Sequence, residues 1–391
     1  MDFELSEEQK EIKMAAREFA EKEFKPEIGR EYDQKYEWPL ELYRKAGKLG
    51  FIGVHFPEEY GGQGLGVLEM CLIWEEFFRV DSTLAHILWG QEGADIVVNF
   101  GTEEQKKKYI PGLCRGELIS TLALTEPSHG SDVGVMGLDT RATKDGEYWI
   151  INGEKTFISM GNVADWMVVG CQTNPNAKPL YRGISAIIVE KGTPGLEVRV
   201  LHPKMGQKSV PTTALSFDNV RVPLTNLVGE ENKGFYYIVD YLNVERLQVA
   251  AACLGAAQGA FERALKYSTQ RTQFGNPIAR YQLIQSKVAD MATKIEASRL
   301  LLYKACWLYD HKKDDRSLIR RACAMAKQVA VSTALEVIDE AIQIHGGYGY
   351  VDSDLERYYR DIRLYRIGAG TEEILKIAIA RELYREIGFD I

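Results

Sequence analysis

The sequence lacks the features that mark metal-binding, secreted, membrane and nucleic-acid-binding proteins. Its six cysteines are scattered, with no CxxC pair and no Cys/His cluster at metal-ligand spacing, so reduced thiols in a cytoplasm fit best. No run approaches the roughly 18 apolar residues of a membrane span, and the N-terminus "MDFELSEEQKEIK" is too acidic and polar for a signal peptide. A net charge of -8 without a basic face argues against nucleic acid.

The 391 residues suffice for two or three domains. They divide into three stretches that differ in hydrophobic periodicity and composition. Residues 1–118 read as helical, with Ser6 placed to cap the first helix. Residues 119–229 hold short β-branched and aromatic runs divided by Asn-Gly and Pro-Gly, which predict an antiparallel β domain. Residues 230–391 begin with an unusually long Ala-rich helix and predict a helical bundle. The fold class is therefore mainly α with a central β domain.

Four short strings carry polar groups or glycines where chemistry could occur, and each also has an ordinary structural interpretation. They are a polar turn, a strand end, a helix–turn–helix junction and a glycine-rich helix end: "LALTEPSHGSD" (122–132), "GEKTFIS" (153–159), "RTQFGNPIARYQLIQ" (271–285) and "QIHGGYGY" (343–350). The last lacks the strand-to-helix setting of a dinucleotide fingerprint, and its His345 has no neighbour to complete a metal site. Singly, the first string is as consistent with an ordinary turn as with a binding site, whereas the second and third favour plain strand and helix structure.

In this order, however, the strings resemble the acyl-CoA dehydrogenase family over essentially the whole chain. The N-terminal strings "EEYGGQG" and "GTEEQKKKYIP" and the C-terminal "GAGTEE" extend the resemblance. It implies an FAD enzyme with an N-terminal α-helical domain, a middle antiparallel β-barrel-like domain and a C-terminal four-helix bundle. It also implies a homotetramer.

The resemblance implies two groups of FAD-binding residues. Those that would line the isoalloxazine or its surroundings are Leu122, Leu124, Thr125, Ser131, Phe157, Ser159, Thr371 and Glu373. Phe157 departs from the tryptophan common at its position but keeps an aromatic surface. Those that would reach the FAD of a neighbouring subunit are Arg271, Phe274, Gln282, Gln343 and Gly347.

The implied reaction removes an α proton and a β hydride from an acyl thioester, and the flavin accepts the hydride. The protein must then supply positioning, a base and polarisation of the thioester carbonyl. Residues that would contact the substrate are Gln91, Ser131, Tyr236, Tyr241, Arg246, Ala369 and Gly370.

The chain departs from the common family pattern at the position of the catalytic base. Many members carry a glutamate directly before the Gly-Thr of the C-terminal motif, where this chain has Ala369, which accepts no proton. Members resembling isovaleryl-CoA dehydrogenase place the glutamate in the long helix before an arginine, as Glu245 precedes Arg246. Helical spacing puts Glu245 on an apolar strip, which predicts a raised pKa, unless an Arg or Lys from another helix pairs with it.

Other carboxylates remain alternatives to Glu245. Glu372 and Glu373 follow Thr371 in the first turn of a helix, where carboxylates favour the helix dipole and cap N–H groups. Members of the family that act on cyclohexane- and cyclohexene-carboxyl-CoA draw bases from the N-terminal domain, in the region of Gln91 and Glu92.

The sequence thus predicts a cytoplasmic FAD-dependent acyl-CoA dehydrogenase that makes a 2-enoyl-CoA, with Glu245 as base and an electron-transferring flavoprotein as electron acceptor. The space left by Ala369 suits a branched or cyclic acyl group. Three alternatives stay open: an enoyl-CoA reductase on the same fold, a flavin or acyl-CoA binding protein without catalysis, and a flavin oxidase acting without CoA.

Overall fold

The computed structural model describes residues 4–351 and 353–389, and begins with a helical N-terminal part. Its helices are α1 (Glu7–Glu23), α2 (Pro26–Lys35), α3 (Leu40–Lys48), α4 (Val67–Val80), α5 (Ser82–Ala85), α6 (Ala94–Phe100) and α7 (Glu103–Cys114), with the 3-10 turns η1 (Glu58–Tyr60) and η2 (His86–Gly90). Ser6 caps α1 as predicted, since its side chain accepts the backbone N–H of Gln9 and the Gln9 side chain returns the bond.

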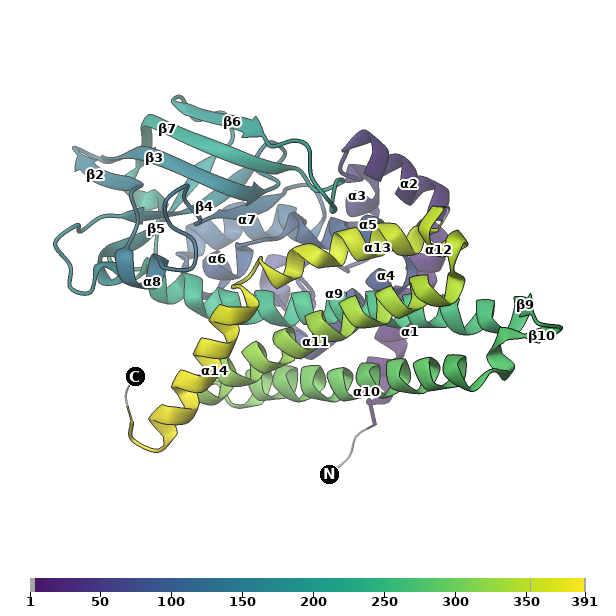
Figure 1. Cartoon of the computed structure of the whole chain (residues 1–391). Helices are drawn as coiled ribbons and strands as arrows, with labels where there is room; N and C mark the ends of the chain where they lie inside the picture. The colour runs from purple at the N-terminus through teal and green to yellow at the C-terminus, as the bar shows by residue number, and fades with distance from the viewer. Residues whose placement is uncertain (1–3, 352, 390–391) are drawn as a thin grey trace.

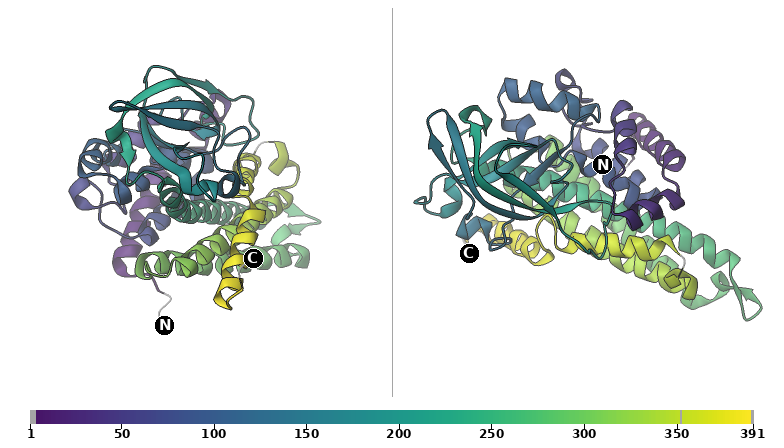
Figure 2. Two further views of the ribbon diagram at one scale, coloured as in Figure 1. Left: turned by 90° about the vertical axis from the view of Figure 1, so that its left-hand side faces the viewer. Right: turned by 90° about the horizontal axis from the view of Figure 1, so that it is seen from above.

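An eight-stranded sheet comes next in the chain, strongly twisted and set beside the helices (Figures 1 and 2). Its strands are β1 (Ser120–Ala123), β2 (Arg141–Asp145), β3 (Tyr148–Ser159), β4 (Trp166–Gln172), β5 (Ile184–Glu190), β6 (Leu196–Val200), β7 (Thr212–Pro223) and β8 (Leu227–Val228), with the short α8 (Val133–Met136) and the turns η3 (Leu180–Gly183) and η4 (Leu224–Asn226). The strand order is β6-β7-β3-β2-β4-β5-β8, and β1 pairs with β4.

The prediction of an antiparallel sheet is wrong for two of these pairings. β4 runs parallel to both β1 and β2, whereas the other neighbours are antiparallel. Parallel neighbours need a long connection. Residues 124–165 supply one between β1 and β4, and residues 146–165 supply one between β2 and β4. The first of these connections contains most of the polar string 122–132 together with α8.

The C-terminal part is a bundle of long helices (Figure 1). Its elements are α9 (Gly234–Gln270), the hairpin β9 (Thr272–Gln273) and β10 (Asn276–Pro277), η5 (Ile278–Arg280), α10 (Gln282–His311), α11 (Arg316–His345), α12 (Gly347–Val351), α13 (Asp354–Arg363), η6 (Leu364–Arg366) and α14 (Glu372–Glu386). Helix α11 packs against α9, α10 and α14. No helix of the described ranges is long and apolar enough to cross a membrane.

Helix α9 joins the three parts because glycines let other backbones approach it. A Cβ at Gly255 would lie 2.1 Å from the carbonyl oxygen of Glu75 in α4. A Cβ at Gly234, where α9 begins, would lie 2.3 Å from the backbone nitrogen of Ala186 in β5. The helix therefore starts against the sheet, crosses α4 and ends at the β9–β10 hairpin on the far side (Figures 1 and 2).

Candidate active site

A small cavity lies where the N-terminal helices, the sheet and the bundle meet. Its volume is about 60 Å³. The lining residues come from η2 and the segment directly after it, from the end of β3, from the loop before β7, from α9 and from η6 with the turn after it: Trp89, Glu92, Ser159, Gln207, Val210, Glu245, Val249, Leu364, Tyr365, Gly368 and Ala369. Two carboxyl groups and the Ala369 position of the C-terminal motif therefore share one space.

Glu245 is buried on the apolar side of α9, with 9% of its surface exposed. Burial raises the pKa of Glu245 to about 7, although the positive charges of Lys327 and Arg246 work against that rise. Among the described residues no ion pair joins Glu245 to a lysine or arginine, so its carboxylate keeps room to accept a proton. A carboxyl group with a pKa of about 7 is partly ionised at neutral pH and, when ionised, can accept a proton.

Glu92 faces Glu245 from the N-terminal part. Burial raises the pKa of Glu92 well above its ordinary value, and the charge of Glu245 raises it further. The Thr121 hydroxyl oxygen lies 3.4 Å from a Glu92 carboxyl oxygen and 2.7 Å from the Ser159 carbonyl oxygen. Burial and the charge of the neighbouring carboxyl group therefore both disfavour the ionised form of Glu92.

The turn between η6 and α14 is held by a buried lysine. Lys327 in α11 is fully buried, and its Nζ donates hydrogen bonds to the carbonyl oxygens of Gly368 and Gly370, the latter at 2.6 Å. Between them Ala369 has a φ of 55° and Gly370 has a φ of 87°, both in the left-handed region. Lys327 thus fixes the part of the cavity wall from which the family's glutamate would otherwise project.

The rival carboxylates of the C-terminal motif face elsewhere. The hydroxyl of Thr371 caps α14 by accepting the backbone N–H of Ile374. Glu372 accepts hydrogen bonds from Arg366 and Lys376, which lower its pKa. Glu373 is exposed, and hydrogen bonds from the capped N-terminus of the helix lower its pKa. Neither group lines the cavity, and neither is basic enough for the proton transfer.

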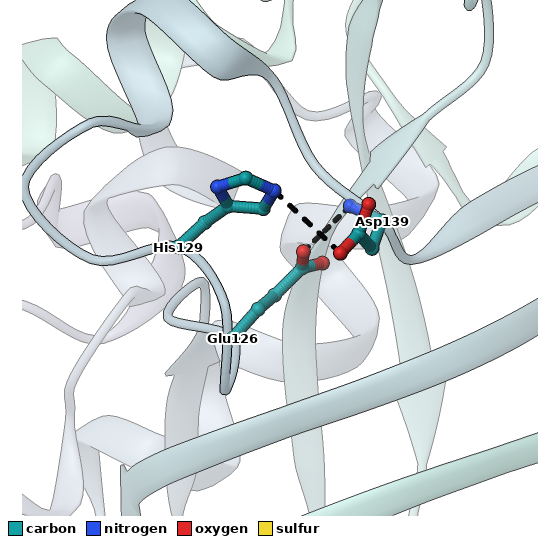
Figure 3. A group of neighbouring side chains, drawn as sticks. All are labelled: Glu126, His129 and Asp139. Carbon is teal, nitrogen blue, oxygen red and sulfur yellow. Dashed lines mark hydrogen bonds and ion pairs between the residues drawn. The ribbon is translucent and has the colours of Figure 1, made fainter.

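The polar loop after β1 is fastened by Glu126. Its carboxylate accepts the backbone N–H groups of Asp139 at 2.6 Å and of Thr140 at 2.8 Å, and it forms a fully buried ion pair with Lys155 at 2.9 Å. Figure 3 shows Glu126 turned toward the Asp139 backbone, with the His129 ring facing the Asp139 carboxylate, whose closest atoms are 3.5 Å apart. Because these partners already use the Glu126 oxygens, the cluster anchors the loop and presents Leu124 and Thr125 at the sheet edge.

Residues expected around the isoalloxazine gather at that edge. The backbone N–H of Thr156 bonds to the Thr125 carbonyl at 2.9 Å, which brings the end of β3 beside the loop. Phe157 has a φ of 58° and is 69% exposed, so its ring offers an uncovered apolar face. With the half-buried hydroxyls of Thr125 and Ser159 nearby, this edge fits a flat aromatic ring with polar margins. Ser131 lies exposed on the loop, and Leu122 is buried in β1.

The second group of expected FAD residues lies at the opposite end of the bundle. Arg271 and Gly347 line a cavity of about 560 Å³ together with Tyr267, Gln273, Ile278 and the residues around His345. Phe274 in the hairpin is 94% exposed. Gln282, at the start of α10, and Gln343, near the end of α11, are also exposed. Because the 37-residue α9 spans roughly 55 Å at about 1.5 Å per residue, a single chain separates the two groups.

The remaining expected substrate contacts are unevenly placed. Tyr241 and Arg246 are buried on α9, and the Tyr241 hydroxyl and the Arg246 Nε have no hydrogen-bond partner among the described residues. Tyr236 is 42% exposed at the start of the helix. Gln91 is buried, but its amide accepts the Gly53 N–H at 3.0 Å and donates to the Leu88 carbonyl, so it fastens the segment beside Glu92 instead of lining the cavity.

Several cavity residues had no signal strong enough to be found from the sequence. Trp89, Gln207, Val210 and Tyr365 lie in segments without a recognisable motif. Lys327 carried a weak signal, since it is a lone lysine in the run "ACAMAKQVAVSTA" of an apolar helix. Such a lysine is exposed in most helices, and only the packing of α11 against η6 shows that this one is buried.

Models of the three acyl-CoA dehydrogenase domains match almost the whole chain. The N-terminal domain matches residues 6–117, the middle domain residues 121–220 and the C-terminal domain residues 232–384. Members of this family are FAD flavoproteins.

Relatives along the full length include both dehydrogenases and reductases. The chain is 39% identical to a mitochondrial isobutyryl-CoA dehydrogenase of Dictyostelium discoideum, over 98% of this chain and 90% of the relative. It is 41% identical to an acryloyl-CoA reductase (NADH) of Anaerotignum propionicum, over 98% and 96%. It is 39% identical to CarC, a subunit of the caffeyl-CoA reductase-Etf complex of Acetobacterium woodii, over 98% and 100%.

Solved structures agree with this assignment. The butyryl-CoA dehydrogenase of Megasphaera elsdenii superposes with a TM-score of 0.92 at 37% identity, covering 98% of this chain and 100% of that one. PigA, solved with FAD and proline, superposes with a TM-score of 0.92 at 30% identity, over 98% and 99%. Order of domains, fold and sequence therefore agree, and the chain is an oxidoreductase that belongs to the acyl-CoA dehydrogenase family.

Proposed function

We propose that the protein is an FAD-dependent acyl-CoA dehydrogenase in which Glu245 removes the α proton of an acyl-CoA thioester, giving a 2-enoyl-CoA. The observation that carries this proposal is the cavity shared by Glu245 and Ala369. At that place the chain has no acid in the C-terminal motif but has a buried carboxyl group on α9, whose pKa of about 7 suits a base at neutral pH.

The residues around Glu245 can bind and orient a thioester. The partnerless donors of Tyr241 and Arg246 are buried near the base and can donate hydrogen bonds to a polar part of a substrate. Arg246 also approaches Gly370, since its Nη2 would lie 3.9 Å from a Cβ at that position. When Glu245 has accepted the proton, its neutral form is the one that burial favours, so the low polarity of the cavity assists the transfer.

Residues at the sheet edge would hold the flavin, with Phe157 against the ring and Thr125, Ser159, Leu122 and Leu124 around it. Bound FAD supplies the acceptor for the β hydride. Arg271, Phe274, Gln282, Gln343 and Gly347 would serve the FAD of a second chain, because they lie at the far end of α9. This division supports a homo-oligomer, which we propose to be a tetramer.

The substrate class we propose is a branched or cyclic acyl-CoA, for example of the cyclohexanecarboxyl-CoA type. Ala369 supports it, because its methyl group leaves space in the cavity that a glutamate would fill. An electron-transferring flavoprotein is the proposed electron acceptor, in line with the relative that forms part of a reductase-Etf complex. The reductases among the relatives make the reverse reaction, enoyl-CoA reduction, the second candidate function.

Flavin bleaching tests the proposal directly. The purified FAD-loaded protein is mixed without oxygen with straight, branched, dicarboxylic and cyclic acyl-CoA thioesters, and the loss of flavin absorbance is followed. We expect bleaching with branched or cyclic thioesters and its loss in E245Q, which keeps the shape of the side chain. Full bleaching by E245Q would refute the base assignment and direct attention to Glu92. Tight CoA binding without bleaching would favour a binding protein, and oxygen consumption without an electron carrier would favour an oxidase.

A further inference from the structure

Lys327 is a buried cation without a carboxylate partner. It is fully buried in α11, and no ion pair joins it to an acid among the residues that the structure describes. Placing an unpaired ammonium group in a protein interior is costly, and a leucine or methionine would fill the same helix position without that cost. Apolar packing therefore does not explain why a lysine occupies this position.

Lys327 holds the turn at the cavity wall. The Lys327 ammonium group bridges the carbonyl oxygens of Gly368 and Gly370, on either side of Ala369. The left-handed conformation of Ala369, with a φ of 55°, costs on the order of 1 kcal/mol for a residue with a Cβ. Two charge-assisted hydrogen bonds hold the backbone in this conformation, which keeps the Ala369 methyl group at the cavity surface.

Lys327 also contributes to the electrostatic environment of Glu245. The titratable and charged groups that act on Glu245, or on the cations beside it, come from α9, α11 and the segment after η2: Tyr241, Arg246, Cys253, Arg320, Cys323, Lys327 and Glu92. Among the cations, Lys327 has the larger effect and Arg246 the smaller, and both favour the ionised form of Glu245. Burial acts in the opposite direction and with greater strength.

We propose that Lys327 is a positioning residue that acts through Glu245 and through the turn 368–370. Its ammonium group fixes the cavity wall and, at the same time, stabilises the buried carboxylate in its ionised form. The inference rests on the proposed function in which Glu245 is the base. A neutral hydrogen-bonding side chain at position 327 could hold the turn but could not stabilise the carboxylate of Glu245 by its charge.

Four variants separate the charge of Lys327 from its hydrogen bonds. K327Q keeps a donor for the turn but removes the charge, K327R keeps both, and K327M removes both. K204M is the matched control. Lys204 is a half-buried lysine that likewise donates to a carbonyl oxygen, that of Val210 at 2.6 Å, and to a hydroxyl oxygen, that of Thr212 at 2.8 Å. Glu245 is not among the groups that shift its pKa.

The first measurement needs no activity. Infrared difference spectra of the folded protein are recorded across the pH range, and the C=O band of the protonated Glu245 is identified as the one absent from E245Q. We expect the midpoint of this band to rise by about one pH unit or more in K327Q and K327M and to stay close to the wild type in K327R and K204M. An unchanged midpoint in K327Q would overturn the inference, as would an equal rise in K327R. Where K327M does not fold, the pair of K327Q and K327R decides.

The second measurement links the charge to the reaction. With saturating acyl-CoA, flavin reduction by K327Q at pH 7 should fall about fivefold and recover at higher pH, because a rise of one unit leaves about one tenth of the base ionised. A loss that does not recover with pH would contradict the charge role and leave only the turn. If E245Q still bleaches the flavin, the proposed function fails, whereas the infrared midpoints still decide whether Lys327 controls the ionisation of Glu245.

Discussion

Glu92 and Glu245 line the same cavity from different parts of the chain, and the charge of Glu245 raises the pKa of Glu92. Neither forms an ion pair among the described residues. The cavity therefore holds two acids whose pKa values are both raised by burial. Environments that shift the pKa values of two neighbouring acids are a feature of sites that transfer protons at neutral pH.

Glu92 should make the stability of the protein depend on pH. Its pKa in the folded state lies well above the ordinary value of 4.5, so the folded chain binds a proton that the unfolded chain releases. Stability from this group is complete below that ordinary value and is lost as the pH rises toward the folded-state pKa, by up to about 1.4 kcal/mol per pH unit. E92Q carries an uncharged amide and lacks this loss.

Urea unfolding of wild type and E92Q between pH 5 and pH 9 measures this difference. We expect the free energy of unfolding of E92Q, relative to wild type, to increase with pH. A difference that is constant over this range would mean that Glu92 is ionised in the folded protein. E373Q, on an exposed side chain, is the control and should follow the wild type.

A carboxylate at position 369 should compensate for the loss of Glu245. Both positions line one cavity, so A369E introduced into E245Q brings an acid back to the reacting space from the other wall. We expect E245Q to lose roughly a hundredfold or more in the rate of flavin reduction, and E245Q/A369E to regain at least about tenfold with straight-chain thioesters. Branched and cyclic thioesters should not regain activity, because the new side chain fills the space beside Ala369. Equal rates for E245Q/A369E and E245Q/A369Q would show that the added carboxylate accepts no proton.

Removing one partner of the buried Glu126–Lys155 ion pair should lower the free energy of unfolding more than replacing both partners. K155M leaves the fully buried carboxylate with two backbone N–H donors but without its cation. We expect the free energy of unfolding to fall by about 3–5 kcal/mol, measured in urea. The double variant E126L/K155M should be more stable than K155M alone, since no charge then remains buried. A K155M protein as stable as wild type would contradict the assigned role of the pair in anchoring the loop after β1.

His86 should make the protein sensitive to mild acid. The ring is fully buried next to Tyr365, and burial lowers its pKa from 6.5 to about 3. The stability from its neutral form is complete above the unfolded-state value and is lost as the pH falls from 6.5 toward 3, because only the unfolded chain takes up the proton. Between pH 7 and pH 5 this amounts to about 2 kcal/mol.

The comparison of wild type with H86N isolates this contribution. H86N should be less stable at pH 7, because Tyr365 loses a partner, but the difference from wild type should shrink by about 2 kcal/mol at pH 5. H311N, at an exposed histidine, should leave the difference between the two pH values unchanged. A parallel loss of stability in wild type and H86N would show that His86 is protonated in the folded state.

Most of the fold could be read from local chemistry. Ser6 and Thr371 cap helices because a side-chain oxygen next to a helical run has backbone N–H groups within reach. The turn at Gly275 joins β9 and β10 because that residue has a positive φ, which glycine adopts without strain. The order of helices, strands and helices follows from periodicity in the same way.

The site could be predicted only in part. Glu245 was found because the chain resembles family members that place the glutamate before an arginine in this helix, and its apolar helical strip supports that assignment. Ala369 was found because it departs from the C-terminal motif of the family. The parallel pairing of β4 was missed, because the partners of a strand are decided largely by connections and packing that the strand itself does not show. Glu92 was located only as a region, and Lys327 not at all.

The sequence by itself determined the succession of helices and strands and the helix caps, because each depends on neighbours along the chain. Its family resemblance pointed to the missing acid at Ala369 and to the candidate base at Glu245. Tertiary structure alone decided that Glu92 stands against Glu245, that Lys327 is buried beneath the 368–370 turn, and that the two groups of expected FAD residues lie at opposite ends of α9. These features also decide the charges. Desolvation and electrostatic coupling depend on distance in space, and segments far apart in sequence acquire that distance only when they pack together.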